Sequence, residues 1–112
     1  MANQASNSAV IGAKQARAAV VLTTKSVAPT ETHLETDSTA GAFTMTMPYS
    51  YECPAGRPFT IRHIVDGGDV TVAFKTQEGI VPGTAQVITV AGGYTVLVPF
   101  EGGWAVADSK LS

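Results

Sequence analysis

The 112-residue sequence has almost none of the covalent features that stabilise small domains. Cys53 is its only cysteine, so no disulfide can form within the chain. No group of histidines, cysteines and carboxylates has the convergent spacing of a zinc site. A domain of about 80 residues buries only roughly 60–65% of its unfolded surface, and it often needs a partner for stability. The sequence therefore predicts a self-associating protein with no metal and no cofactor.

Charge is scarce as well, at 14% of residues against a usual fraction of about 25%. Long apolar runs are absent, because Lys14, Arg17 and Lys25 interrupt the most apolar N-terminal stretch before it approaches the roughly 20 residues of a membrane span. The first residues lack the basic start and apolar run of a signal peptide. We therefore expect no membrane partner, and a protein that stays in the reducing cytoplasm where it is made.

Acidic residues are missing from residues 1–29, which carry three cations and a net charge of +3. Residues 30–112 hold four basic and nine acidic residues, a net of −5. Three cations without an aromatic residue among them do not suffice for a nucleic-acid-binding arm. The pattern favours an arm that docks onto an acidic protein surface, with no nucleic-acid partner.

The hydrophobic pattern divides the chain at the same place. Residues 1–29 show no strand-like alternation, although Ser8–Ala19 could form a short helix capped by Ser8. We expect residues 1–29 to be an N-terminal arm that becomes ordered on what it touches, followed by one domain over residues 30–112. A disordered tail is the alternative.

From residue 30 onward, apolar and polar residues alternate in short runs rich in valine, threonine and aromatics, which is typical of half-buried strands. The runs cover residues 31–36, 43–47, 59–65, 70–74, 88–90, 94–98 and 104–106. Glycine-containing turns separate them about every ten residues. This pattern predicts an all-β fold, in the form of a small antiparallel β-sandwich or prism-like domain.

Two kinds of connection stand out between the predicted strands. The sequence Asp66-Gly67-Gly68-Asp69 predicts a tight hairpin, because glycines adopt the positive φ angles that such turns demand. Gly92-Gly93 and Gly102-Gly103 indicate further reversals. Residues 50–58 form the one longer irregular connection.

The residues that could carry out catalysis are few. Cys53 lacks a histidine and an orienting group to activate it, so it is interpreted as a small buried or loop thiol. His63 shares a strand face with apolar residues, which predicts an imidazole in the core or at a subunit contact. His33 is expected on an exposed strand edge. The acidic residues fall in turns and at strand ends, unlike the facing carboxylate pair of a glycosidase. The sequence therefore predicts that the protein is not an enzyme.

Aromatic residues fall into two groups. Phe59, Phe74, Tyr94 and Trp104 alternate with core valines and are expected in the core, although a sugar-binding groove is the alternative. Tyr49 and Tyr51 lie in a loop bounded by prolines. Tyrosines are enriched at interfaces, so Tyr49 and Tyr51 are candidate contacts with another subunit or a neighbouring protein. His63 is a third candidate contact, because of the strand face on which it falls.

Three segments together resemble a known family. They are AFTMTMP, AGRPFTIRHIVDGGDVTVAF and QVITVAGGYTVLVPFEGGWAV, within a stretch from about Thr32 to Asp108. This stretch is similar to a β module that recurs in bacteriophage tail-fibre and virion-surface proteins. The module closes with a Gly–Trp–x–Val strand, which Gly103, Trp104 and Val106 match. The resemblance implies a homotrimeric β module on a virion.

The layout of one module behind an arm is similar to the head-decoration, or cement, proteins of tailed phages. The resemblance then implies a trimer made in the host cytoplasm, located on the capsid surface, with the major capsid protein as its partner. The expected docking residues of the arm are Val10, Ile11, Lys14, Arg17, Val20, Val21, Leu22 and Lys25. The alternative is a receptor- or glycan-binding tail-fibre module that uses residues 50–57 and 76–83.

Overall fold

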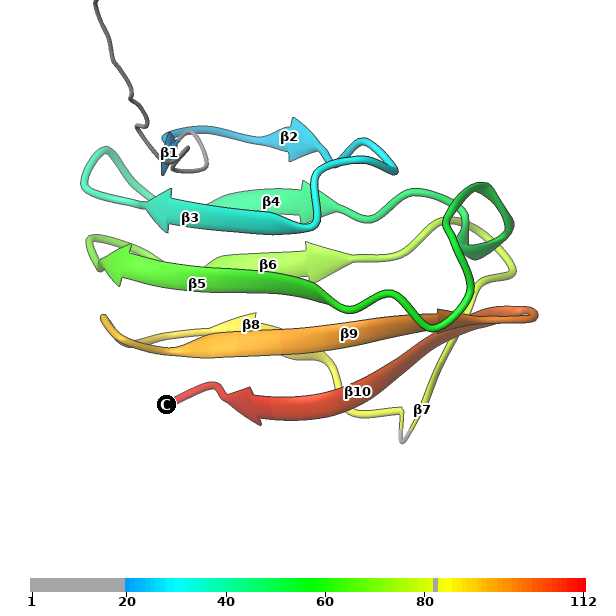
Figure 1. Ribbon diagram of the computed structural model, residues 1–112. Helices are drawn as coiled ribbons and strands as arrows, with labels where there is room; N and C mark the ends of the chain where they lie inside the picture. The colour runs from blue at the N-terminus through cyan, green and yellow to red at the C-terminus, as the bar shows by residue number, and fades with distance from the viewer. Residues whose placement is uncertain (1–19, 82) are drawn as a thin grey trace, which may run out of the picture.

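A computed structural model describes residues 20–81 and 83–112, and this part of the chain is all-β, as the alternation predicted. Its strands are β1 (Val20–Val21), β2 (Lys25–Ser26), β3 (His33–Asp37), β4 (Phe43–Thr46), β5 (Phe59–Val65), β6 (Val70–Ala73), β7 (Gly79–Val81), β8 (Gln86–Ile88), β9 (Tyr94–Phe100) and β10 (Gly103–Lys110). One 3-10 helix, η1 (Ser50–Glu52), lies between β4 and β5. The strands form two layers that lie one behind the other in Figure 1.

Both sheets are mixed, so the prediction of an antiparallel fold was wrong. The six-stranded sheet has the order β1-β3-β5-β9-β10-β7, and the four-stranded sheet has the order β2-β4-β6-β8. Five neighbouring pairs are parallel: β1–β3, β3–β5, β2–β4, β4–β6 and β7–β10. The pairs β5–β9, β6–β8 and β9–β10 are antiparallel. Alternation of apolar and polar residues shows the face of the sheet on which each side chain lies. This alternation is the same in parallel and antiparallel strands, so it does not reveal the direction of a neighbouring strand.

The parallel pairs arise because the chain winds as a coil from β1 to β6. Successive strands alternate between the two sheets, so β1, β3 and β5 stack in one layer while β2, β4 and β6 stack in the other. Figure 1 shows this winding as three successive turns. Val20 is in register with Glu35, and Glu35 with Arg62, so equivalent positions of the three turns lie side by side.

The expected hairpin at residues 66–69 is instead a crossing from one sheet to the other. It links β5 to β6, and it stacks on the equivalent crossing between β3 and β4. A Cβ atom on Gly67 would lie 2.5 Å from the carbonyl oxygen of Ser38, and one on Gly68 would clash with the backbone of Ala42. The two glycines therefore allow close approach of two backbones, rather than a reversal within one sheet.

The last third of the chain follows the predicted pattern more closely. β9 and β10 form the expected hairpin, and Gly102 occupies its turn with a φ of +92°. β9 then pairs antiparallel with β5, which joins the hairpin to the coiled part. β7 was not predicted, because three residues give too short a run for alternation to be recognised.

The core lies between the two layers and confirms the expected placement of the largest side chains. Trp104 and Phe59 are buried, and their rings meet edge to face with centroids 5.2 Å apart. Such pairs contribute about 1 kcal/mol beyond their burial. The indole N–H of Trp104 donates a hydrogen bond to the carbonyl oxygen of Pro48. Phe74 and Tyr94 are only partly buried.

The structured body includes part of the segment predicted as an arm. Within residues 20–29, β1 pairs with β3, β2 pairs with β4, and Val27 is a core residue. The six-stranded sheet therefore begins ten residues, and the four-stranded sheet five residues, before the expected start of the domain at residue 30. The predicted helix at Ser8–Ala19 lies outside the described residues.

Candidate functional site

A buried polar cluster surrounds His63. The Nδ1 atom of His63 is 2.8 Å from the hydroxyl of Thr36, and its Nε2 atom is 3.0 Å from a carboxylate oxygen of Asp66. The hydroxyl of Ser38 lies 3.2 Å from the same Nε2. With its proton on Nε2, His63 can donate to Asp66 while Nδ1 accepts from Thr36. Its side chain is fully enclosed, which confirms a hydrogen-bonded core imidazole and leaves none of it on the surface for a subunit contact.

Ser38 joins this cluster to the stacked crossings. Its hydroxyl donates to the carbonyl oxygen of Gly68 at 2.6 Å and accepts the N–H groups of Gly67 and Gly68 at 3.0 and 3.1 Å. In a catalytic triad, serine and carboxylate lie at opposite nitrogens of the histidine ring. Here Ser38 and Asp66 both lie at Nε2, so the three side chains do not have the geometry of a triad. They instead hold the crossing at residues 66–69 against the rest of the cluster.

The tyrosine pair predicted as a contact lies in and beside η1. Tyr51 is 78% exposed, and its ring stacks on that of Tyr49 with centroids 5.0 Å apart. The ammonium of Lys75 lies 4.8 Å from the centre of the Tyr49 ring. The carboxylate of Glu78 accepts hydrogen bonds from both the N–H and the hydroxyl of Ser50. Two residues, Lys75 and Glu78, therefore hold the turn that carries Tyr51 in place.

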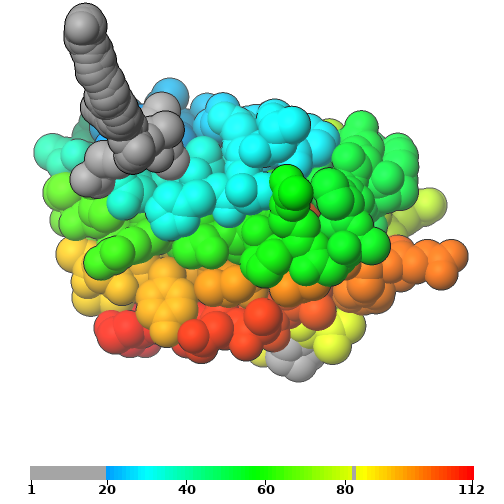
Figure 2. Space-filling view, in the orientation of Figure 1, coloured from blue at the N-terminus to red at the C-terminus, as the bar shows by residue number. Residues whose placement is uncertain are grey.

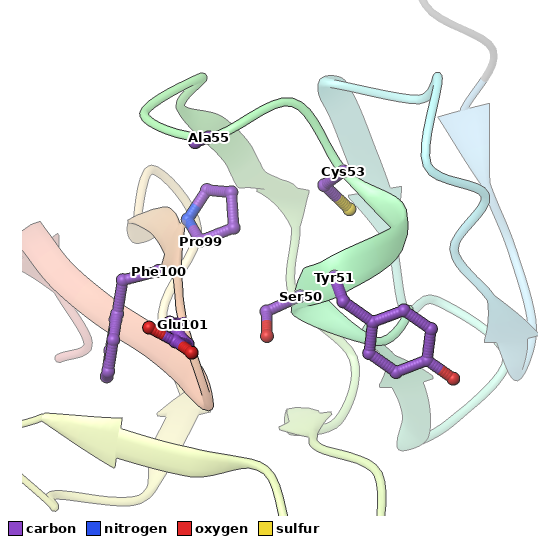
Figure 3. Close-up of a pocket in the computed structure, with 7 residues that line it drawn as sticks. All are labelled: Ser50, Tyr51, Cys53, Ala55, Pro99, Phe100 and Glu101. Atoms are coloured by element: carbon purple, nitrogen blue, oxygen red, sulfur yellow. The ribbon is translucent and has the colours of Figure 1, made fainter.

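A pocket of about 290 Å³ opens beside this turn, between η1 and the end of β9 (Figure 3). Its lining residues are Ser50, Tyr51, Cys53, Ala55, Pro99, Phe100 and Glu101. Figure 3 shows the Glu101 carboxylate between Phe100 and Ser50, with Tyr51 beyond Ser50. In Figure 2 the green loop of η1 and the orange β9–β10 turn protrude at the same end of the molecule. Two segments distant in sequence thus form one concave surface.

Negative charge acts on this pocket. Burial, together with the nearby carboxylates of Glu52 and Glu78, raises the pKa of the Cys53 thiol. Partial burial and the same two carboxylates also raise the pKa of Tyr51. A raised pKa keeps Cys53 protonated, the opposite of what a nucleophilic thiolate requires. Two of the lining residues therefore have carboxylates near them, an environment that suits a cationic group better than an anion.

The expected docking residues that the structure describes differ in how far they are exposed. Leu22 and Val20 are exposed, at 60% and 41% of their surface, whereas Val21 is buried in the core. Lys25 forms an ion pair with Glu31 at 3.1 Å. The other expected docking residues, Val10, Ile11, Lys14 and Arg17, lie outside the described residues.

Sequence reasoning found one wall of the pocket and missed the other. It selected Tyr51, which lines the pocket, but not Pro99, Phe100 and Glu101, which contribute the opposite wall. The only signal for the second wall was an aromatic and an acidic residue placed just before the Gly102-Gly103 turn, where a side chain projects from the end of a hairpin.

Two classes of site are absent from the described part of the chain. Residues 20–81 and 83–112 contain no group of three or more histidine, cysteine or carboxylate side chains that could hold a metal ion. The same residues contain no helix of the length and hydrophobicity that crossing a bilayer requires.

No protein-family model matches this sequence, and no curated protein matches it either.

Proposed function

We propose that this protein is a non-catalytic structural protein of a phage virion, a decoration protein that binds the outer surface of the capsid and stabilises the shell. In this proposal the two layers form a sandwich- or prism-like module that assembles as a homotrimer. The residues preceding β1 bind the major capsid protein. The proposal rests on the resemblance of residues 32–108 to virion β modules and on the features of the body described above.

The observation that carries the proposal is the difference between the two outer ends of the six-stranded sheet. At the N-terminal end, β1 is only two residues long and is flanked by exposed Val20 and Leu22. At the other end the outer strand is β7, which pairs only with Gly103–Ala105 of β10, and β10 then has a bulge between Val106 and Asp108, where the Asp108 carboxylate accepts the N–H of Ser109. Bulges and charged residues discourage strand addition. The end from which residues 1–19 lead instead exposes the apolar side chains of Val20 and Leu22, which supports contact with an apolar partner surface there.

The charge of residues 1–19 supports attachment at that end. Residues 1–19 carry Lys14 and Arg17 with no acidic residue, while the body is acidic. An arm of this kind fits an acidic protein surface, and three linked arms multiply a weak contact into high avidity.

The test is deletion of residues 1–19, which leaves β1 and β2 in place. We expect the shortened chain to remain folded, with the thermal transition of the full chain, and to lose binding to purified empty heads in a co-sedimentation assay. The full-length variant Val10→Asp/Ile11→Asp should also bind more weakly. Full decoration of heads by the shortened chain would refute docking through the arm.

A receptor- or glycan-binding fibre module is the second candidate, because Tyr51 and Phe100 are exposed on turns at one end of the body. Aromatic residues on anchored turns are common in binding surfaces. The copy number in purified particles separates the two proposals, since a decoration protein is present in hundreds of copies and a fibre module in tens at most.

A further inference from the structure

We propose that the pocket between η1 and the β9–β10 turn binds the guanidinium of Arg17 from a second copy of this chain. This inference rests on the self-association in the proposed function, and it names the contact that links two copies. Residues further along the arm, such as Val10 and Ile11, stay free to reach a larger assembly.

The pocket has the chemistry of a site for a guanidinium. Phe100 presents an exposed aromatic ring with the Glu101 carboxylate beside it, and exposed Tyr51 lies on the far side of Ser50 (Figure 3). Arginine stacks on aromatic faces and donates two parallel hydrogen bonds to a carboxylate, which a lysine ammonium cannot do. Tyr49 already holds the ammonium of Lys75 against its ring, so this loop accommodates a cation on an aromatic face.

The walls of the pocket are held in place before anything binds. Cys53 donates its backbone N–H to the carbonyl oxygen of Ser50, and Tyr49 donates its backbone N–H to the carboxylate of Glu52. Glu78 anchors Ser50 from the neighbouring loop. Binding a side chain in a fixed pocket loses less conformational entropy than ordering a mobile loop.

The carboxylates around the pocket favour a cation that comes from a segment of chain with no acidic residues. The carboxylates of Glu52 and Glu78 raise the pKa of Tyr51 and Cys53 after the larger effect of burial, so their negative field reaches the lining side chains. The loop's own cation, Arg57, is exposed and does not line the pocket. Residues 1–19 have a net charge of +2 and no acidic residue, which makes them the complementary segment of this chain.

The strand register excludes the pocket of the same copy for Arg17. Val20 lies in line with Glu35, Arg62 and Tyr94 across four strands. Three interstrand steps span about 14 Å across the sheet, and the six residues from Tyr94 to Phe100 run roughly 20 Å along β9 at right angles to them, which puts Phe100 about 24 Å from Val20. Arg17 precedes Val20 by three residues, and these with the extended arginine side chain reach at most about 17 Å. A second copy must therefore supply the arginine.

The experiment is a charge-swap cycle in the full-length chain. Sedimentation velocity over a range of concentrations measures the association constant of wild type, Glu101→Lys, Arg17→Glu and the double variant. We expect each single change to weaken association by about tenfold or more, and the double variant to associate more tightly than either single variant while staying weaker than wild type, because the swap restores the ion pair but not the stacking of a guanidinium. Asp69→Lys, an equal charge change in the distant β5–β6 crossing, is the matched control and should leave association unchanged.

Each other result overturns the inference. A wild-type chain that is monomeric at every concentration has no such contact. Loss of association in Glu101→Lys without rescue by Arg17→Glu removes Arg17 as the occupant. Glu101→Gln, a milder change in the exposed turn, must also weaken association if Glu101→Lys fails to fold. The measurement uses no shells, so a wild-type chain that shows an intact charge-swap cycle but does not bind heads would refute the decoration proposal alone.

Discussion

Residues 20–73 and residues 86–110 are built from similar alternating strands but connect them differently. In the first region each crossing carries the chain to the other sheet, and equivalent strands stack in parallel. In the second, β9 returns directly as β10 in the same sheet. The difference lies in what the glycines face, since Gly68 lies against the Ala42 backbone while Gly102 has open space around it. A glycine pair can therefore reverse the chain within one sheet or let two backbone segments pack closely, and the atoms around the pair decide which of the two occurs.

The largest expected effect comes from adding one methyl group at each of these glycines. Gly68→Ala should destabilise the fold by about 3 kcal/mol, because a Cβ there meets backbone that cannot move aside. Gly102→Ala should cost only about 1–2 kcal/mol, from its positive φ alone. Urea unfolding of both variants measures the difference. Equal losses would show that the stacked crossings are not tightly constrained.

A smaller contrast is expected for buried hydroxyls in the two regions. Ser38→Ala leaves the N–H groups of Gly67 and Gly68 without their acceptor, which should cost about 2 kcal/mol. Thr95→Val removes a single donor to the side chain of Gln86 and should cost about 1 kcal/mol. The same unfolding measurement applies. A greater loss for Thr95→Val would place the more important polar contact in the antiparallel region.

The smallest expected effect is a difference in pH response. The backbone N–H of Ala28, followed in effect by Lys25, holds the pKa of Glu31 below its ordinary value of 4.5 against the opposing effect of burial. The ionised carboxylate therefore stabilises the first region above pH 4.5, and this contribution is lost as the pH falls through the lowered pKa. It is at most about 1 kcal/mol, because both partners of the ion pair are about one-third exposed.

The antiparallel region should respond at the other end of the pH scale. The hydrogen bond to Asp108 raises the pKa of Tyr94 above 10.0, so its contribution is present below that pH and is lost as the pH rises through the raised pKa. Glu31→Gln should remove only the acid response below pH 4.5, and Tyr94→Phe only the alkaline response above pH 10.0. The opposite assignment in urea titrations would contradict this division.

Much of the fold was predictable because alternation reports on burial directly. The pattern of β5, with Phe59, Ile61 and His63 buried, follows from the sequence alone. The stacking of β3 on β5 did not follow, because backbone pairing leaves no mark on side-chain periodicity. The two-residue strands β1 and β2 were too short to recognise in the sequence.

The candidate site was half predictable for a related reason. Tyr51 could be selected from its own loop, where prolines prevent a regular strand. Glu101 could not be joined to it, because the two residues meet only through the pairing of β5 with β9. A pocket formed by distant segments requires the topology, and the topology was the part of the prediction that was wrong.

The contact between Trp104 and Pro48 has a consequence for how the molecule assembles. The hydrogen bond joins residues 56 positions apart, and Trp104 is the only tryptophan in the sequence. The coiled part cannot complete its interior until β10, close to the end of the chain, has been synthesised. Folds that depend on such distant contacts close slowly, in milliseconds to seconds. The intrinsic fluorescence of this one indole therefore reports the moment at which the two regions join.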